Sequence, residues 1–89
     1  MRRARVVVSG RVQGVFFRAG CAEEARRRGV AGFVANRPDG RVEAVFEGEN
    51  ADVDAMIDWC RSGTDWAVID SMEVTEEAPE GATSFDVER

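Results

Sequence analysis

The sequence predicts an α+β fold in which the elements follow the order β-α-β-β-α-β, with one short strand after them. Three observations predict this order. Three consecutive valines shortly before a glycine are typical of a buried strand, and two segments repeat apolar residues at helical spacing. A Pro-Asp-Gly turn joins two segments in which apolar and polar residues alternate. Because 89 residues provide for one hydrophobic core, we expect a single domain over residues 1–89.

The first strand and the first helix lie on either side of a glycine-containing turn. Residues 4–9 predict a central strand buried on both faces, because β-branched residues suit that position. Residues 19–28 predict a helix whose charged face points to water, and Gly29 is expected to end it. The apolar face of this helix carries Phe17, Cys21, Ala22 and Ala25.

Two strands are predicted to form a hairpin. Residues 31–36 and 41–47 alternate in polarity, and Pro38-Asp39-Gly40 between them is a turn signal. Pro presets φ, Asp can accept a bond from nearby backbone, and Gly accepts positive φ. In the second strand we expect Val42, Ala44 and Phe46 to be buried and Arg41, Glu43 and Glu47 to be exposed.

The second helix is predicted to begin at Asn50, as its N-cap, and to end at Ser62-Gly63. Its apolar face carries Val53, Met56, Ile57 and Cys60. Because Asp54 and Asp58 lie on the opposite face, we interpret them as solvated carboxylates and not as a metal site.

Residues 66–75 predict a fourth strand, and residues 84–88 a short fifth strand with Phe85 and Val87 facing the core. This order is the split βαβ, or ferredoxin-like, plan, in which both helices cover one face of an antiparallel-type sheet. The turn after the first strand and the end of the second strand can then meet at one edge. That arrangement places Asn36 within reach of Arg18.

Composition limits the possible functions. The net charge is −5, from 17 acidic residues and 12 basic residues that are all arginine. This charge argues against a nucleic-acid partner, which requires clustered basic residues. The lack of lysine is compatible with a GC-rich genome and equally with a high-salt cytoplasm.

Neither a metal site nor a membrane partner is predicted. The chain has no histidine, and Cys21 and Cys60 lack metal-ligand spacing. We interpret Cys60 as a core residue and Cys21 as core or as a thiol near the site. No apolar run approaches the ~20 residues that span a bilayer, and the basic start of the chain leads into an apolar run too short for a signal peptide. We therefore expect a cytoplasmic protein.

Residues 9–18, Ser-Gly-Arg-Val-Gln-Gly-Val-Phe-Phe-Arg, connect the first strand to the first helix and are typical of an anion cradle. Gly10 and Gly14 allow backbone angles that turn successive N–H groups to one side, and the helix N-terminus adds partial positive charge. The planar guanidinium of Arg18 suits two oxygens of a phosphate or carboxylate. The alternative is a glycine-containing turn that only changes the chain direction. No nucleotide-binding glycine motif is present.

Residues 10–18 and 32–43 together closely resemble the two signature segments of acylphosphatases. The resemblance covers nearly the whole chain and implies that Arg18 binds the phosphate and that Asn36 positions a water molecule. It also implies a substrate-binding phosphate loop from the backbone of Gln13, Gly14, Val15, Phe16, Phe17 and Arg18. The side chains of Phe16 and Phe17 are interpreted as structural.

The resemblance further implies a small-molecule acyl phosphate as substrate, with no metal or other cofactor. Inorganic phosphate or sulfate is expected to compete, and the protein is expected to be a monomer. An acyl phosphate leaves as a carboxylate, so no general acid is required, and phosphoryl transfer depends mainly on positioning and charge stabilisation.

Alternatives are a non-catalytic anion-binding module, a similar domain of a larger carbamoyl-phosphate-handling protein, and an RNA-recognition domain. The last lacks the aromatic residues and basic surface it needs. The sequence departs from many family members at Thr64, where they carry proline. It also lacks tyrosine, so any aromatic contact to substrate must come from Phe or Trp.

Overall fold

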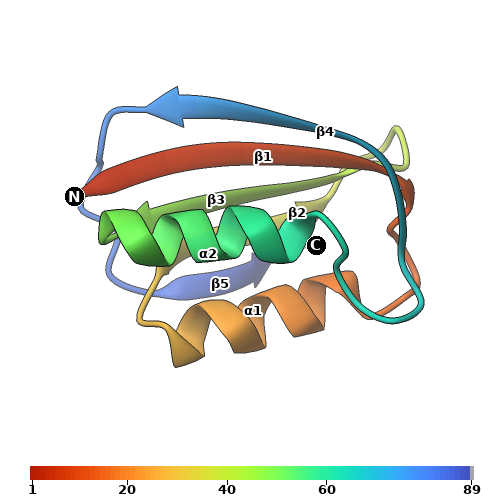
Figure 1. Cartoon of the computed structure of the whole chain (residues 1–89), viewed down its shortest axis with the longest axis horizontal. Coiled ribbons are helices and arrows are strands. Elements are labelled where there is room, and N and C mark those ends of the chain that lie inside the picture. The colour runs from red at the N-terminus through yellow and green to blue at the C-terminus, as the bar shows by residue number, and fades with distance from the viewer. Residues whose placement is uncertain (89) are drawn as a thin grey trace.

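A computed structural model describes residues 1–88 of the chain (Figure 1). The helices and strands follow the predicted order. In chain order they are β1 (Arg2–Arg11), α1 (Phe17–Arg27), β2 (Ala31–Asn36), β3 (Val42–Gly48), α2 (Asn50–Cys60), β4 (Val68–Glu77) and β5 (Phe85–Glu88). The strand β2 covers the predicted residues, while β1 is longer than predicted at both ends and β4 is shifted toward its carboxyl end.

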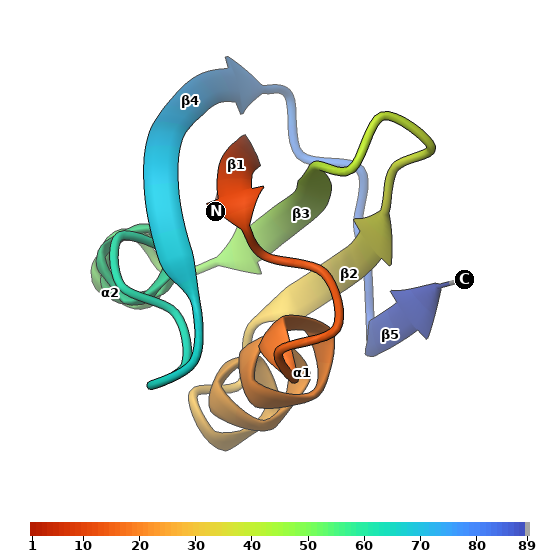
Figure 2. The same cartoon turned by 90° about the vertical axis from the view of Figure 1, so that its right-hand side faces the viewer.

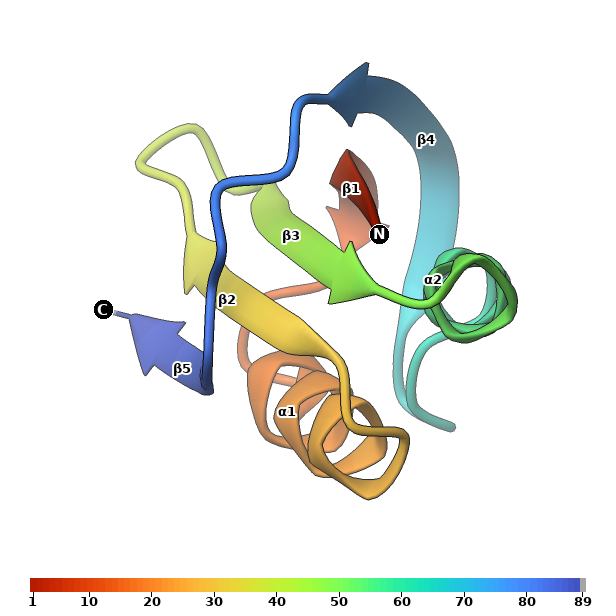
Figure 3. The same ribbon diagram turned by 90° about the vertical axis from the view of Figure 1, so that its left-hand side faces the viewer.

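The strands form one sheet in the order β4-β1-β3-β2-β5. Strand β1 is antiparallel to both β4 and β3, and β3 is antiparallel to β2. Both helices pack on one face of this sheet (Figures 2 and 3). The ferredoxin-like α+β fold is therefore confirmed, with one difference. Because β5 pairs in parallel with β2, the sheet is mixed and not antiparallel throughout.

The pairing sets the direction of three strands. Since β1 and β2 are each antiparallel to β3, they run in the same direction, and β5 follows β2. The carboxyl ends of β1, β2 and β5 therefore lie at the same edge of the sheet. Figure 2 views this edge, where the chain leaves β1 and enters α1.

The core lies between the helices and the covered face of the sheet. The apolar faces predicted for both helices are buried, and the core includes Cys21 and Cys60. The rings of Phe46 and Phe85 stack with centroids 5.9 Å apart. At the end of α1, Val30 N–H donates to Ala25 O at 2.9 Å and Gly29 N–H donates to Arg26 O at 3.2 Å. This pair of hydrogen bonds is the Schellman motif of a helix that ends at glycine.

The prediction that β1 is buried on both faces is wrong. Residues Ala4, Val6 and Val8 are buried toward the helices, but Arg5 and Val7 on the other face are only partly buried. Among residues 1–88, neither helix covers that face, and Arg5 pairs there with carboxylates of β3 and β4. On the open face of the sheet, ion pairs between neighbouring strands therefore take the place of a second apolar layer.

Three further predictions need correction. Glu47, expected to be exposed, is only 1% exposed. The N-cap of α2 is Glu49, not Asn50, whose side chain instead accepts a hydrogen bond from Arg2 at 3.1 Å. Val87 remains 43% exposed, because β5 is an edge strand at the margin of the core, although Phe85 is buried as predicted.

Glu47 is buried because its carboxylate organises the segment between β4 and β5. It accepts bonds from the N–H groups of Glu80 and Gly81 at 2.9 Å and of Ala82 at 3.0 Å, and from Arg3 Nη1 at 3.1 Å. The bond from the Glu80 N–H, together with those from Arg3 and its neighbours, lowers the pKa of the Glu47 carboxyl below its ordinary value of 4.5 despite burial.

We predict that this carboxylate stabilises the fold at neutral pH. A lowered pKa in the folded state favours folding above the ordinary pKa of 4.5, and this contribution is lost as the pH falls through the folded value. Glu47→Gln should lower the melting temperature at pH 7, because its amide nitrogen would face N–H donors. The difference between wild type and this variant should shrink as the pH falls below 4.5, the ordinary pKa. Thermal melts of Glu47→Gln between pH 7 and pH 3 test this prediction, with Glu23→Gln, at an exposed position of α1, as control. Equal melting temperatures for both variants at pH 7 would contradict it.

Candidate functional site

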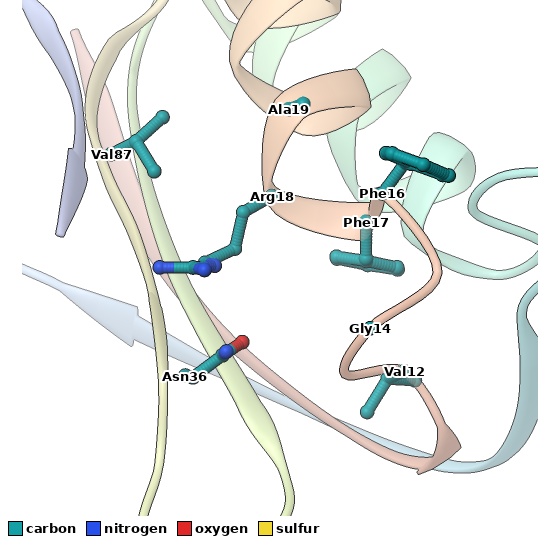
Figure 4. Close-up of a pocket in the computed structure, with 8 residues that line it drawn as sticks. All are labelled: Val12, Gly14, Phe16, Phe17, Arg18, Ala19, Asn36 and Val87. Carbon is teal, nitrogen blue, oxygen red and sulfur yellow. The ribbon is translucent and has the colours of Figure 1, made fainter. Parts of the chain in front are cut away.

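A cavity of about 340 Å³ opens at the edge of the sheet where β1, β2 and β5 end (Figure 4). The residues that line it come from the β1–α1 turn, from the first turn of α1, and from the ends of β2 and β5. They are Val12, Gly14, Phe16, Phe17, Arg18, Ala19, Asn36 and Val87. The only polar side chains among them are those of Arg18 and Asn36.

The β1–α1 turn and the first turn of α1 carry backbone N–H groups beside this cavity that have no protein acceptor within residues 1–88. Gly14 has φ 74°, and Phe16, the N-cap of α1, has φ 63° and ψ 22°. Within residues 1–88, none of the N–H groups of residues 14–19 donates to a protein acceptor. The first turn of α1 also carries no acidic residue. The helix N-terminus therefore presents free donors and partial positive charge, which suit an anion.

Arg18 and Asn36 enter the cavity from different elements. Arg18 lies in the first turn of α1, and Asn36 is the last residue of β2, paired with Val42 of β3. Figure 4 shows the guanidinium and the amide pointing into the same space. Arg18 Nη1 also donates to Glu88 O at 2.8 Å, so the end of β5 orients the guanidinium. The juxtaposition predicted from the topology is present.

Gln13 joins the turn to the hairpin. Its side-chain Nε2 donates to the carbonyls of Arg37 at 2.8 Å and Arg41 at 2.9 Å. Gln13 and Val15, both predicted in the phosphate loop, do not line the cavity, and Val15 is buried. The side chain of Gln13 therefore has a positioning role that the sequence alone did not reveal, because its partners are main-chain atoms more than twenty residues away.

Thr64, in the segment between α2 and β4, contacts the β1–α1 turn. Its hydroxyl donates to Val15 O at 2.7 Å. Proline, which many family members carry at this position, has no side-chain donor and could not make this bond. The departure from the family pattern thus adds a contact that holds the backbone next to the cavity.

Two arginines of the hairpin next to the cavity are compensated by a carboxylate. Arg41 pairs with Asp39 at 2.7 Å and Arg37 lies 3.7 Å from the same carboxylate. The Arg41 guanidinium lowers the pKa of Asp39, which therefore stays ionised and offsets positive charge at the hairpin. Across residues 1–88, Arg18 forms no ion pair with a carboxylate. Arg18 is therefore the cation that the cavity presents directly.

Cys21 does not belong to the site. It is buried in the core, and a hydrogen bond with Cys60, together with burial, raises the pKa of its thiol. The alternative of a thiol near the site is therefore excluded. In the part of the chain that the structure describes, no three His, Cys, Asp or Glu side chains form a group that could hold a metal ion. No helix among these residues is long and apolar enough to cross a membrane.

Three contributions to the cavity were missed by the sequence reasoning: those of Val12, Ala19 and Val87. The first two flank the predicted phosphate loop and its arginine, so the extent of the loop was underestimated. The sequence predicts Val87 in the core because it lies two residues after Phe85 and therefore on the same face of the strand. Its role at the cavity follows only from the parallel pairing of β5 with β2.

Comparisons with known proteins agree with this architecture. The acylphosphatase family model matches residues 4–87. An acylphosphatase of Gloeobacter violaceus is 59% identical over 87 residues, covering 98% of this chain and 94% of that protein. An acylphosphatase of Rubrobacter xylanophilus is 56% identical, covering 97% of this chain and 79% of that protein.

A solved structure extends the likeness to three dimensions. The crystal structure of acylphosphatase from Bacillus subtilis superposes with a TM-score of 0.95 at 37% identity, covering 100% of both chains. The family resemblance of the two signature segments is thus confirmed by whole-chain similarity in sequence and in fold. The chain therefore belongs to the acylphosphatase family of hydrolases.

Proposed function

We propose that the cavity hydrolyses the carboxyl–phosphate bond of small acyl phosphates, giving a carboxylate and inorganic phosphate. The observation that carries this proposal is that Arg18, Asn36 and residues 16–19 at the start of α1, whose N–H groups have no protein acceptor within residues 1–88, line one cavity. The N–H groups and the guanidinium would hold the phosphate oxygens. The Asn36 amide would hold the attacking water.

The proposed reaction needs little from side chains. Water attacks phosphorus in line with the departing acyl oxygen, the P–O bond to the acyl group breaks, and the carboxylate leaves unprotonated. Charge on the equatorial phosphate oxygens is stabilised by Arg18 and the backbone donors, which are already oriented before the reaction. The proton of the water passes to a phosphate oxygen of the substrate itself. No general base is required from the protein in this scheme.

Further parts of the proposal concern the protein as a whole. The same donors would bind inorganic phosphate or sulfate, since each has the tetrahedral shape of the transferred group. We also propose that residues 1–89 act as one domain, as a monomer, and in the cytoplasm.

The first prediction from this proposal is hydrolysis without a metal ion. Purified protein should hydrolyse both acetyl phosphate and benzoyl phosphate. For each substrate the rate should be the same before and after treatment with a chelator, because the proposed stabilising charges belong to Arg18 and the backbone. Release of phosphate is the measurement. A rate that falls on chelation and returns with Mg²⁺ or Zn²⁺ would contradict the proposal.

The second prediction concerns Arg18. Arg18→Gln should weaken competitive inhibition by phosphate and sulfate and abolish measurable turnover, because charge-assisted hydrogen bonds of this kind contribute about 1.5–3 kcal/mol each. Arg28→Gln is a suitable control, since Arg28 pairs with Glu24 at the far end of α1. A folded Arg18→Gln protein with an unchanged phosphate inhibition constant would exclude the assigned role.

The third prediction separates binding from chemistry at Asn36. Asn36→Ala leaves the backbone donors and Arg18 in place, so the phosphate inhibition constant should stay nearly unchanged. Turnover should fall by roughly 10²–10³, the effect of removing one oriented donor.

The control is Asn50→Ala, because Asn50 lies at the start of α2 and bonds Arg2. Inhibition constant, kcat and melting temperature should be measured for both variants. If Asn36 is only a turn residue, its variant will melt lower and keep a near-normal kcat, and the proposed role would then be wrong.

A further inference from the structure

Beside the cavity lies a pair of exposed aromatic side chains. The rings of Phe16 and Trp66 meet edge to face, with centroids 5.7 Å apart and planes at 65°. Phe16 is 69% exposed and Trp66 63% exposed, although each carries a large apolar surface. Phe16 lines the cavity directly, and Trp66 extends this surface from the segment between α2 and β4. A contiguous exposed apolar patch at a cavity is typical of a ligand-binding surface.

The backbone makes the position of the Phe16 ring unusual. With φ 63° and ψ 22°, Phe16 adopts the left-handed conformation, which is uncommon for a bulky residue and easiest for glycine. Its carbonyl is fixed by the N–H of Gly20 at 3.0 Å. The next residue, Phe17, is only 1% exposed and fills the core. The turn thus places one phenylalanine inside and holds its neighbour outside, at the cavity.

The cavity has more room than a phosphate group needs. Its volume of about 340 Å³ corresponds to roughly eleven water molecules, at ~30 Å³ each. Apart from Arg18 and Asn36, its lining side chains are apolar. The phosphate would occupy the part near Arg18. Phe16 is among the apolar residues that border the remaining space.

The direction of the proposed reaction identifies what occupies that space. In phosphoryl transfer, the attacking and leaving oxygens lie roughly in line across phosphorus. If Asn36 holds the water, the acyl group must leave on the side away from Asn36. In Figure 4, Phe16 lies on the opposite side of the cavity from Asn36, beyond Phe17. The acyl group would therefore leave toward Phe16.

We propose that Phe16 and Trp66 form the binding subsite for the acyl group, and that the enzyme prefers acyl phosphates with an aromatic or bulky apolar acyl group. This inference rests on the proposed function of the same cavity. An aromatic acyl group can pack against the ring of Phe16 and reach that of Trp66, whereas an acetyl group is too small to contact both rings. Contacts of this kind favour the larger substrate.

The experiment compares benzoyl phosphate with acetyl phosphate in wild type and Trp66→Ala. Trp66 lies outside the phosphate-binding residues, so kcat/KM for acetyl phosphate should change less than about twofold. For benzoyl phosphate kcat/KM should fall roughly fivefold to tenfold, as expected for the loss of one aromatic contact. Trp66→Phe should keep most of the wild-type kcat/KM for benzoyl phosphate. The control is Val74→Ala, which removes another exposed apolar side chain, 41% exposed on β4, and should change neither substrate.

A second measurement separates this inference from the proposed hydrolysis. Phenylphosphonate and methylphosphonate carry the same anion and cannot be hydrolysed, so their binding can be followed by calorimetry even if turnover is absent. Wild type should bind phenylphosphonate more tightly, and Trp66→Ala should lose that preference. Equal binding of both phosphonates by wild type, or an unchanged preference in Trp66→Ala, would overturn the aromatic subsite while leaving the hydrolysis of acyl phosphates unaffected.

Discussion

The position of the cavity depends on the directions in which the strands of the sheet run. Because β1 and β2 are both antiparallel to β3, their carboxyl ends lie at the same edge of the sheet, and β5 joins them there through its parallel pairing with β2. This brings the β1–α1 turn, Asn36 and Val87 around one cavity, although they are distant in the sequence. The amino end of α1 opens at the same place and adds its free N–H donors.

Local charge explains how an acidic protein can present a site for an anion. The chain has a net charge of −5, yet many of its carboxylates are engaged by arginines away from the cavity. On the open face of the sheet, Arg5 pairs with Glu43 and Glu77, and at the start of β1 Arg2 pairs with Asp54 and Glu76. Distant charges are screened beyond ~8 Å at physiological ionic strength. The field inside the cavity is therefore governed by Arg18 and the helix terminus.

Patterns within one element were predictable from the sequence, and contacts between distant elements were not. The alternation in residues 31–36 predicted β2, and the apolar faces predicted the buried sides of both helices. The topology brought Arg18 and Asn36 together. In contrast, the burial of Glu47 depends on N–H groups of residues 80–82, and the contact of Thr64 with Val15 joins two loops. Period and propensity carry no signal for such contacts, because they arise only after the elements pack.

The bonds made by Gln13 have a consequence for sequence variation at the site. Its amide recognises the hairpin through main-chain carbonyls, which residues 37 and 41 present whatever side chains they carry. Mutational drift at these two positions can therefore alter the surface charge near the entrance while the spacing between the turn and Asn36 is kept. Proline at position 37 is the exception, because the N–H of Arg37 donates to Arg41 O at 2.7 Å. The hairpin is thus open to evolutionary tuning of the approach to the cavity, and Gln13 is not.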